Sequence, residues 1–234
     1  MSIILQNYNG ITILRDDLLP GGTKSILMSA MINPDADEIA YASSRYGGLQ
    51  VALAHYCKSI GKPLTIVTAQ HKSIHKNTME IINNETNVIY VFPAHTRVIE
   101  ARLREYVAQR NVQIINFGAF SQKAIEILTA RAVAVIAAMP LPPDQIWCAV
   151  GSGTLITAIA KAVGNRPITV HGVCVGKVFE TNNGNIKIYY YNKKFAFECK
   201  VHTPFPCNAN YEKKAYELML KHGQGRMLFW NVYS

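Results

Sequence analysis

The sequence lacks the patterns that mark disulfide-built, zinc-binding and membrane-spanning proteins. Its five cysteines are an odd number and include no Cys-x-x-Cys pair, so we expect buried free thiols rather than a disulfide framework or a zinc site. The longest apolar stretch is interrupted by Arg131 and ends near Pro140, and the first residues show no basic-then-apolar signal pattern. These absences predict a cytoplasmic protein without a membrane segment.

Acidic residues are scarce. The chain has 15 Asp and Glu against 24 Lys and Arg, for a formal net charge of +9, and this excess favours an anionic partner or substrate without saying which. Its 234 residues, 49% of them hydrophobic, are enough for two small lobes or one large domain. No internal repeat is visible.

The usual nucleotide fingerprints are also missing. The sequence contains neither Gly-x-Gly-x-x-Gly nor a P-loop ending in Lys-Ser or Lys-Thr. It does contain Gly151-Ser152-Gly153-Thr154, between an apolar predicted strand and a predicted helix. Backbone N–H groups at such a helix start can hold a phosphate, although the turn alone is weak support for that function.

Strand and helix patterns alternate along most of the chain. Strands are predicted at 11–14, 38–42, 64–68, 88–92, 112–117, 145–150, 168–175 and 227–232, and helices after Lys24 and at 47–60, 71–82, 96–110, 122–138 and 155–163. Regular βαβ alternation predicts an α/β fold whose parallel sheets are flanked by helices.

Two turns between strand and helix carry reactive or anion-binding residue types. In the first, Gly21 and Gly22 precede Lys24 and permit positive φ and close backbone approach, which suits a reactive amine beside a ligand. The alternative is an ordinary solvated lysine after a Gly-Gly turn. In the second, residues 43–48 supply hydroxyls and N–H groups suited to a carboxylate, and the alternative is a serine N-cap with packing glycines.

Taken together, these motifs resemble the fold type II, tryptophan-synthase-β-like, pyridoxal-phosphate (PLP) enzymes, and most closely their 1-aminocyclopropane-1-carboxylate (ACC) deaminase and D-cysteine desulfhydrase branch. Arg-Asp-Asp-Leu from Arg15 and Gly-Gly-Thr-Lys ending at Lys24 are similar to two motifs of that branch. Tyr-Glu-Lys-Lys from Tyr211 and the turns at 43–48 and 151–154 are similar to three more. The resemblance implies a two-lobed fold, with a larger cofactor-binding lobe from 1–33 and 121–234 and a smaller lobe from 34–120.

The resemblance also implies roles for single residues. Lys24 would carry the cofactor as a Schiff base and move a proton at the substrate carbon, because a desolvated lysine has a lowered pKa. Glu212 would keep the pyridine nitrogen protonated, unless it is only an exposed acid at a helix start. The implied protein is a PLP-dependent lyase or deaminase-like enzyme, with a homodimer expected, that carries out elimination, deamination or decarboxylation on an amino-acid-like substrate. The implied sites are catalytic Lys24, Tyr211 and Ser44; cofactor-binding Lys24, Gly151, Ser152, Gly153, Thr154 and Glu212; and substrate-binding Ser43, Ser44, Arg45 and Tyr46.

Three features limit this assignment. Thr23 and Arg45 stand where the branch has asparagine, so contacts with cofactor and substrate are expected to differ. Aromatic and lysine residues interleave from Ile186 to Lys200, which permits a nucleic-acid-binding protein of this fold, or an enzyme acting on an amino acid attached to a nucleic-acid base, as in phage thymidine hypermodification. A β-hairpin explains the same alternation without a ligand.

His71 and His75 are four apart on a predicted helix, but no third metal ligand is near, so no metal is expected.

Overall fold

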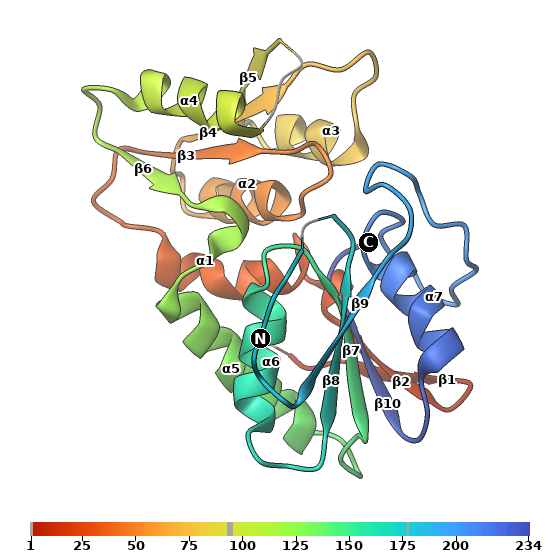
Figure 1. The fold of residues 1–234 in the computed structure, drawn as a ribbon. Helices are drawn as coiled ribbons and strands as arrows, with labels where there is room; N and C mark the ends of the chain where they lie inside the picture. The colour runs from red at the N-terminus through yellow and green to blue at the C-terminus, as the bar shows by residue number, and fades with distance from the viewer. Residues whose placement is uncertain (1, 93–95, 177) are drawn as a thin grey trace. The chain divides into compact units, whose positions relative to one another are not determined.

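The computed structural model describes residues 2–92, 96–176 and 178–234 (Figure 1). The chain forms two compact units, one from Met1–Leu19 together with Phe120–Ser234 and the other from Pro20–Ala119. Both are α/β units, as the alternating pattern predicted.

A six-stranded sheet in the order β1-β2-β10-β7-β8-β9 forms the centre of the first unit. Strand β1 pairs antiparallel with β2, and the other neighbours pair in parallel. Strand β7 is buried along nearly its whole length, because parallel strands in the middle of a sheet are covered on both faces. The strands are β1 (Leu5–Tyr8), β2 (Ile11–Arg15), β7 (Gln145–Val150), β8 (Thr169–Cys174), β9 (Ile186–Tyr190) and β10 (Met227–Asn231).

Helices cover both faces of this sheet (Figure 1). On one face, Cys148 and Val150 of β7 pack in a core with residues of α5 (Gln122–Ala137) and α6 (Thr154–Val163). On the other, Trp147 packs with residues of α7 (Glu212–His222). The alternation of side chains along β7 therefore serves two cores.

The second unit contains a four-stranded parallel sheet in the order β5-β4-β3-β6. Helix α4 packs on one face against Ala40, Ala42 and Val67, and α2 lies on the other (Figure 1). The elements are α1 (Ser25–Met31), β3 (Glu38–Ser43), α2 (Leu49–Ser59), β4 (Leu64–Ala69), α3 (Lys76–Asn83), β5 (Asn87–Val91), α4 (Thr96–Val107) and β6 (Val112–Ile115).

Several sequence predictions need correction. The helix predicted at 71–82 begins only at Lys76, because His75 has extended backbone angles and its Nδ1 accepts a hydrogen bond from the Asn77 N–H as an N-cap. The strand predicted at 112–117 ends at Ile115 and is followed by a 3-10 turn, η3 (Phe117–Ala119). The hairpin considered for 186–200 is absent from the described residues, since β9 pairs in parallel with β8. Strand β1 was not predicted.

The boundary between the units also differs from the predicted lobes. Residues 20–33, which the sequence placed with the larger lobe, fall in the second unit, where α1 packs against α2. The five cysteines are all free thiols, and four of them are buried, as expected. Among the described residues, no helix is long and apolar enough to cross a membrane.

Candidate active site

The predicted phosphate turn follows β7 in the first unit. Gly153 has φ of +87°, a conformation that favours glycine, and it caps α6, which begins at Thr154. The Thr157 N–H donates to the Gly153 carbonyl at 3.1 Å, so the amides before it are directed toward the start of the helix. The Ser152 and Thr154 hydroxyls lie 2.9 Å apart. This turn presents backbone donors, two hydroxyls and the positive helix end to an anion.

Tyr211 lies against this turn, although 60 residues separate the two motifs in the sequence. A Cβ atom at Gly151 would stand 3.2 Å from the Tyr211 ring, so glycine is the residue that permits this approach. The Phe195 ring packs edge-on against Tyr211 with centroids 4.9 Å apart. The structure thus brings together two of the predicted motifs within the first unit.

Lys214, two residues after Glu212, holds the Phe195 segment in place. Its side chain is fully buried, and Nζ donates to the Phe195 carbonyl at 2.9 Å. The ammonium also lies 5.2 Å from the Tyr191 ring centre. Sequence reasoning gave Lys214 no role; its place in the Tyr-Glu-Lys-Lys motif was the only signal, and the structure shows it as a positioning residue for the Phe195–Tyr211 contact.

Glu212 is the first residue of α7 and is 4% exposed. It is therefore not the exposed helix-start acid considered as the alternative. Burial first, and the Glu212 charge second, raise the pKa of the Cys148 and Cys207 thiols, so the carboxylate lies near both residues. A buried acid of this kind is stabilised by a cationic or hydrogen-bonding partner.

The Arg-Asp-Asp motif has a structural role. Arg15 forms two 2.8 Å hydrogen bonds to the Asp17 carboxylate, and Asp16 accepts from Arg131 at 2.6 Å and from the Trp230 indole at 3.1 Å. All three motif residues are buried. The motif therefore joins β2 to α5 and β10 rather than supplying a reactive group.

Lys24 belongs to the second unit and ends a 3-10 turn, η2 (Gly22–Lys24), directly before α1. Gly21 and Gly22 have φ of +79° and +73°, as the sequence predicted. A Cβ atom at Gly21 would lie 2.3 Å from the Ala52 Cα, so this glycine lets the lysine turn pack directly on α2. Lys24 is half-buried.

The predicted carboxylate loop also lies in the second unit, between β3 and α2. Gly48, not a serine, caps α2, and no side chain caps it. The Ser43 hydroxyl donates to the Ser44 carbonyl at 2.9 Å, and Gln50 Nε2 donates to the Ser44 and Arg45 carbonyls at 3.3 and 3.2 Å. The loop is thus fixed by side chains, and it leads into the start of α2, where the helix dipole favours a negative charge.

Comparison with known proteins decides the family. A model described as "Pyridoxal-phosphate dependent enzyme" matches residues 8–194, which is most of the chain. The chain belongs to this family of pyridoxal-phosphate-dependent enzymes. No curated protein matched the sequence.

Solved structures of this PLP enzyme family share the fold. An ACC deaminase homologue aligns with a TM-score of 0.84 at 17% identity, covering 95% of this chain and 84% of its own. A threonine deaminase of T.th. gives 0.73 at 13%, covering 96% and 87%. The O-acetyl serine sulfhydrylase isoform 3 of Entamoeba histolytica gives 0.72 at 12%, covering 99% and 85%. These likenesses show a type II fold related to that of the ACC deaminase homologue.

The residues of the first unit fit pyridoxal phosphate. The turn at 151–154 offers an anion site of phosphate size, and the buried Glu212 offers a carboxylate for a protonated ring nitrogen. Tyr211 lies beside the turn, where its hydroxyl can face the bound group. Gly151, Ser152, Gly153, Thr154 and Glu212 are thus the residues of this unit that would hold the cofactor.

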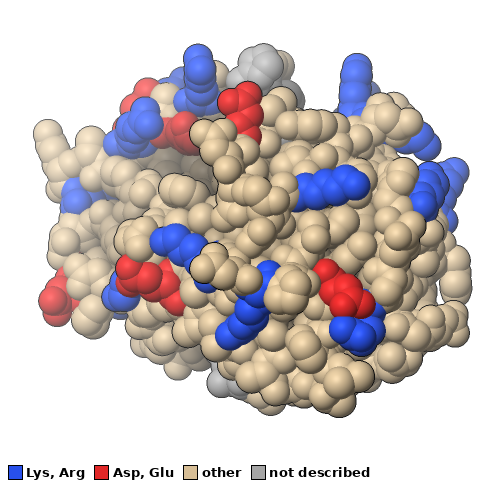
Figure 2. All heavy atoms as spheres, turned by 60° about the horizontal axis from the view of Figure 1, so that its bottom comes forward, with Lys and Arg blue, Asp and Glu red and all other residues tan. Residues whose placement is uncertain are grey.

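The aromatic residues of 186–200 mostly serve the core of this PLP enzyme. Tyr189 stacks in a column with Trp147, His171 and His222, and the Tyr191 hydroxyl donates to Glu217 at 2.6 Å. On the face drawn in Figure 2, Asp and Glu side chains lie beside several of the described Lys and Arg side chains. Packing in a core therefore accounts for much of the interleaved pattern without a nucleic acid.

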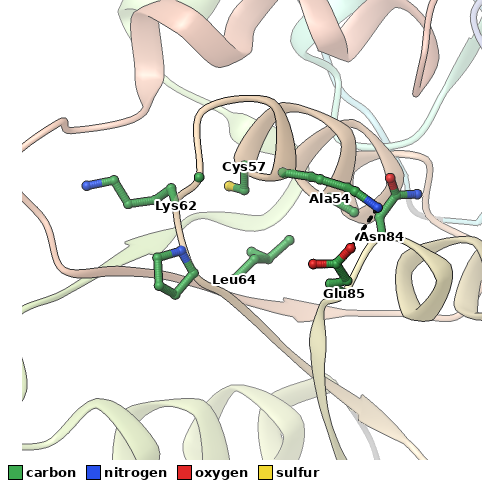
Figure 3. Close-up of a pocket in the computed structure, with 9 residues that line it drawn as sticks. Ala54, Cys57, Lys62, Leu64, Asn84 and Glu85 are labelled. Carbon is green, nitrogen blue, oxygen red and sulfur yellow. Dashed lines mark ion pairs between the residues drawn. The ribbon is translucent and has the colours of Figure 1, made fainter.

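A separate pocket of about 250 Å³ lies in the second unit, at the end of α2 (Figure 3). Lys58 and Glu85 form a 3.0 Å ion pair beside it. Cys57 lines it, but burial raises the pKa of this thiol to about 11, so it is protonated at neutral pH and a poor nucleophile. None of the predicted site residues line this pocket.

The histidines at 71 and 75 do not form the i, i+4 pair of a helix, because both precede α3. Among residues 2–92, 96–176 and 178–234, no group of three or more His, Cys, Asp or Glu side chains could hold a metal ion.

Proposed function

We propose that this PLP-dependent enzyme acts at the α-carbon of an amino acid, by elimination, deamination or decarboxylation. The observation that carries the proposal is the contact of Tyr211 with Gly151, which joins the phosphate turn to the Tyr-Glu motif in a single unit. Pyridoxal phosphate, when bound, withdraws electrons from a bond at the α-carbon of its substrate.

The protein's residues then divide the remaining work. Backbone donors of 151–154 and the hydroxyls of Ser152 and Thr154 bind the phosphate. Glu212 accepts a hydrogen bond from the ring nitrogen and keeps that nitrogen protonated. This hydrogen bond is strong because the carboxylate is charged and buried. Lys24 is the covalent anchor and the base that takes and returns the proton at the α-carbon.

Two further groups orient the substrate. Ser44 and its neighbours bind the α-carboxylate at the start of α2, where the helix dipole favours a negative charge. Tyr211 holds or moves a proton at the substrate, since its ring is fixed between Gly151 and Phe195. The neighbouring structures named as deaminases and a sulfhydrylase support chemistry at an amino acid.

The test is exchange of the substrate α-proton in D₂O, followed by NMR for a panel of amino acids with cofactor added. We expect exchange with at least one amino acid, loss of exchange in Lys24→Ala, and normal exchange in Lys123→Ala, which removes an exposed lysine of α5. Equal exchange by wild type and Lys24→Ala would remove Lys24 from the reaction.

A further inference from the structure

The carboxylate loop and the segment that follows β4 both begin at the carboxyl ends of strands in the second sheet. Strands β3 and β4 are parallel neighbours, with Ser43 in register with Thr68. The carboxyl ends of the two strands therefore lie side by side. Ligands of open parallel sheets bind at the carboxyl ends of the strands. Arg45 reaches from one segment to the other, with Nη1 3.5 Å from the Ser73 carbonyl.

Arg45 is held in a fixed position without an acidic partner. Its guanidinium lies 4.8 Å from the centre of the Tyr46 ring, and Nη2 donates to the Tyr46 hydroxyl at 3.0 Å. Nε is enclosed and makes no hydrogen bond, and no carboxylate lies within ion-pair distance among the described residues. The more deeply buried Arg15 and Arg131 both have carboxylate partners. A half-buried guanidinium that is held only by neutral partners is suited to an external anion.

The surroundings of Arg45 reinforce its charge. No Asp or Glu occurs from Ile39 to Met79. Burial first, and then the Arg45 charge, lower the pKa of His71, which places that ring near the guanidinium. The stretch itself therefore supplies no acidic side chain to offset the Arg45 charge.

Gln50 fixes the backbone of this site through its side-chain amide. It is fully buried, its Nε2 is shared between the Ser44 and Arg45 carbonyls, and its Oε1 has no hydrogen-bond partner among the described residues. Enclosed polar groups without partners are uncommon in folded proteins, and here one, Arg45 Nε, belongs to the loop and the other, Gln50 Oε1, to the first turn of α2.

We propose that Arg45 recognises a second anion on the substrate, so that the preferred amino acid has a side chain ending in a phosphate or carboxylate. This inference rests on the proposed function for the place of the α-carboxylate, which the start of α2 binds. The guanidinium fork matches both phosphate and carboxylate, so the arms of the test separate these two chemistries.

The experiment is isothermal titration of the cofactor-loaded protein with O-phospho-L-serine, L-aspartate and L-serine. We expect one of the two compounds with an anionic side chain to bind about 10- to 100-fold more tightly than L-serine, as hydrogen bonds between charged groups provide. Arg45→Gln should bring that ratio close to one, Arg45→Lys should restore part of it, and Arg97→Gln, which removes an exposed arginine of α4, should leave it unchanged.

The outcomes separate this inference from the proposed function. If the protein takes up cofactor but binds all three compounds equally, or if Arg45→Gln keeps the preference, the recognition by Arg45 is wrong and the proposed function stands. If the preference depends on Arg45 while no amino acid of the panel undergoes α-proton exchange, the anion site stands and the proposed function fails. Melting curves of each variant establish that it is folded.

Discussion

Replacing Gly153 with alanine should damage both the fold and the cofactor site, for reasons that can be separated. Gly153 has φ of +87°, and a left-handed backbone costs an L-residue about 1–2 kcal/mol. The added Cβ would also stand 2.4 Å from the Phe179 ring, and overpacking of this kind costs about 1–3 kcal/mol. We therefore expect Gly153→Ala to lower the free energy of unfolding by about 2–5 kcal/mol, from the sum of the two effects.

Two other glycines provide matched controls. Gly10 has φ of +80° with nothing within 4 Å of the added Cβ, so Gly10→Ala bears only the backbone cost. Gly184 has neither positive φ nor a neighbour within 4 Å, so Gly184→Ala should change little. Denaturant unfolding of the three variants should give the order Gly153, Gly10, Gly184 for the loss of stability.

Measuring cofactor binding shows whether the turn at 151–154 binds the phosphate or is only tightly packed. If the turn holds the phosphate, Gly153→Ala should weaken cofactor binding by about 10-fold or more, as the loss of one hydrogen bond to a charged group predicts, and Gly10→Ala should not. In a Phe179→Ala background, where the clashing ring is absent, Gly153→Ala should cost only the backbone contribution. Equal stabilities of the Gly153 and Gly10 variants, with unchanged cofactor affinity, would refute this reasoning.

Two further predictions concern buried titratable groups. Glu212→Gln should leave the protein folded and able to bind cofactor but slow α-proton exchange severely, because a neutral ring is a poorer electron sink; wild-type exchange rates would exclude Glu212 from the site. Burial, with the Lys187 charge second, lowers the pKa of His171 to about 4, against about 6.5 in an unfolded chain. The contribution of neutral His171 to the free energy of unfolding is therefore complete above about pH 6.5. As the pH falls toward 4, the unfolded chain takes up a proton first, and the free energy of unfolding decreases by at most about 3 kcal/mol. His171→Phe should flatten this part of the stability profile measured by denaturant unfolding, and an unaltered profile would show that His171 is not responsible.

Much of the fold could be predicted from the sequence because its strands are buried on both faces. Strand β7 and helix α6 have continuous apolar or helical patterns, and the structure places both within one residue of the prediction. The helix predicted from His71 failed because the polar segment before Lys76 has no core to pack on, and its start depends on the His75 cap. Strand pairing was harder to predict from the sequence. The pattern of β9 is typical of one strand of a hairpin, and only its register with β8 shows that it extends the parallel sheet.

The candidate site was predictable as separate motifs and not as an arrangement. The turns at Lys24 and Gly151 follow from glycines between strand and helix. The positive φ values of Gly21 and Gly22 appear where expected, whereas that of Gly153 was not predicted. The contact of Gly151 with Tyr211 spans the long segment between β7 and α7, so no local pattern encodes it. The same holds for Asp16, whose buried partners Arg131 and Trp230 lie far along the chain. Long-range pairs of this kind depend on tertiary packing.

The central claim, that Lys24 anchors pyridoxal phosphate, is tested most directly by borohydride reduction of the cofactor-loaded protein and peptide mass spectrometry. We predict that the reduced cofactor mass is found on the peptide containing Lys24, and that Lys24→Ala carries none. A reduced cofactor on another lysine, or an equal yield from the Lys24→Ala protein, would contradict the account.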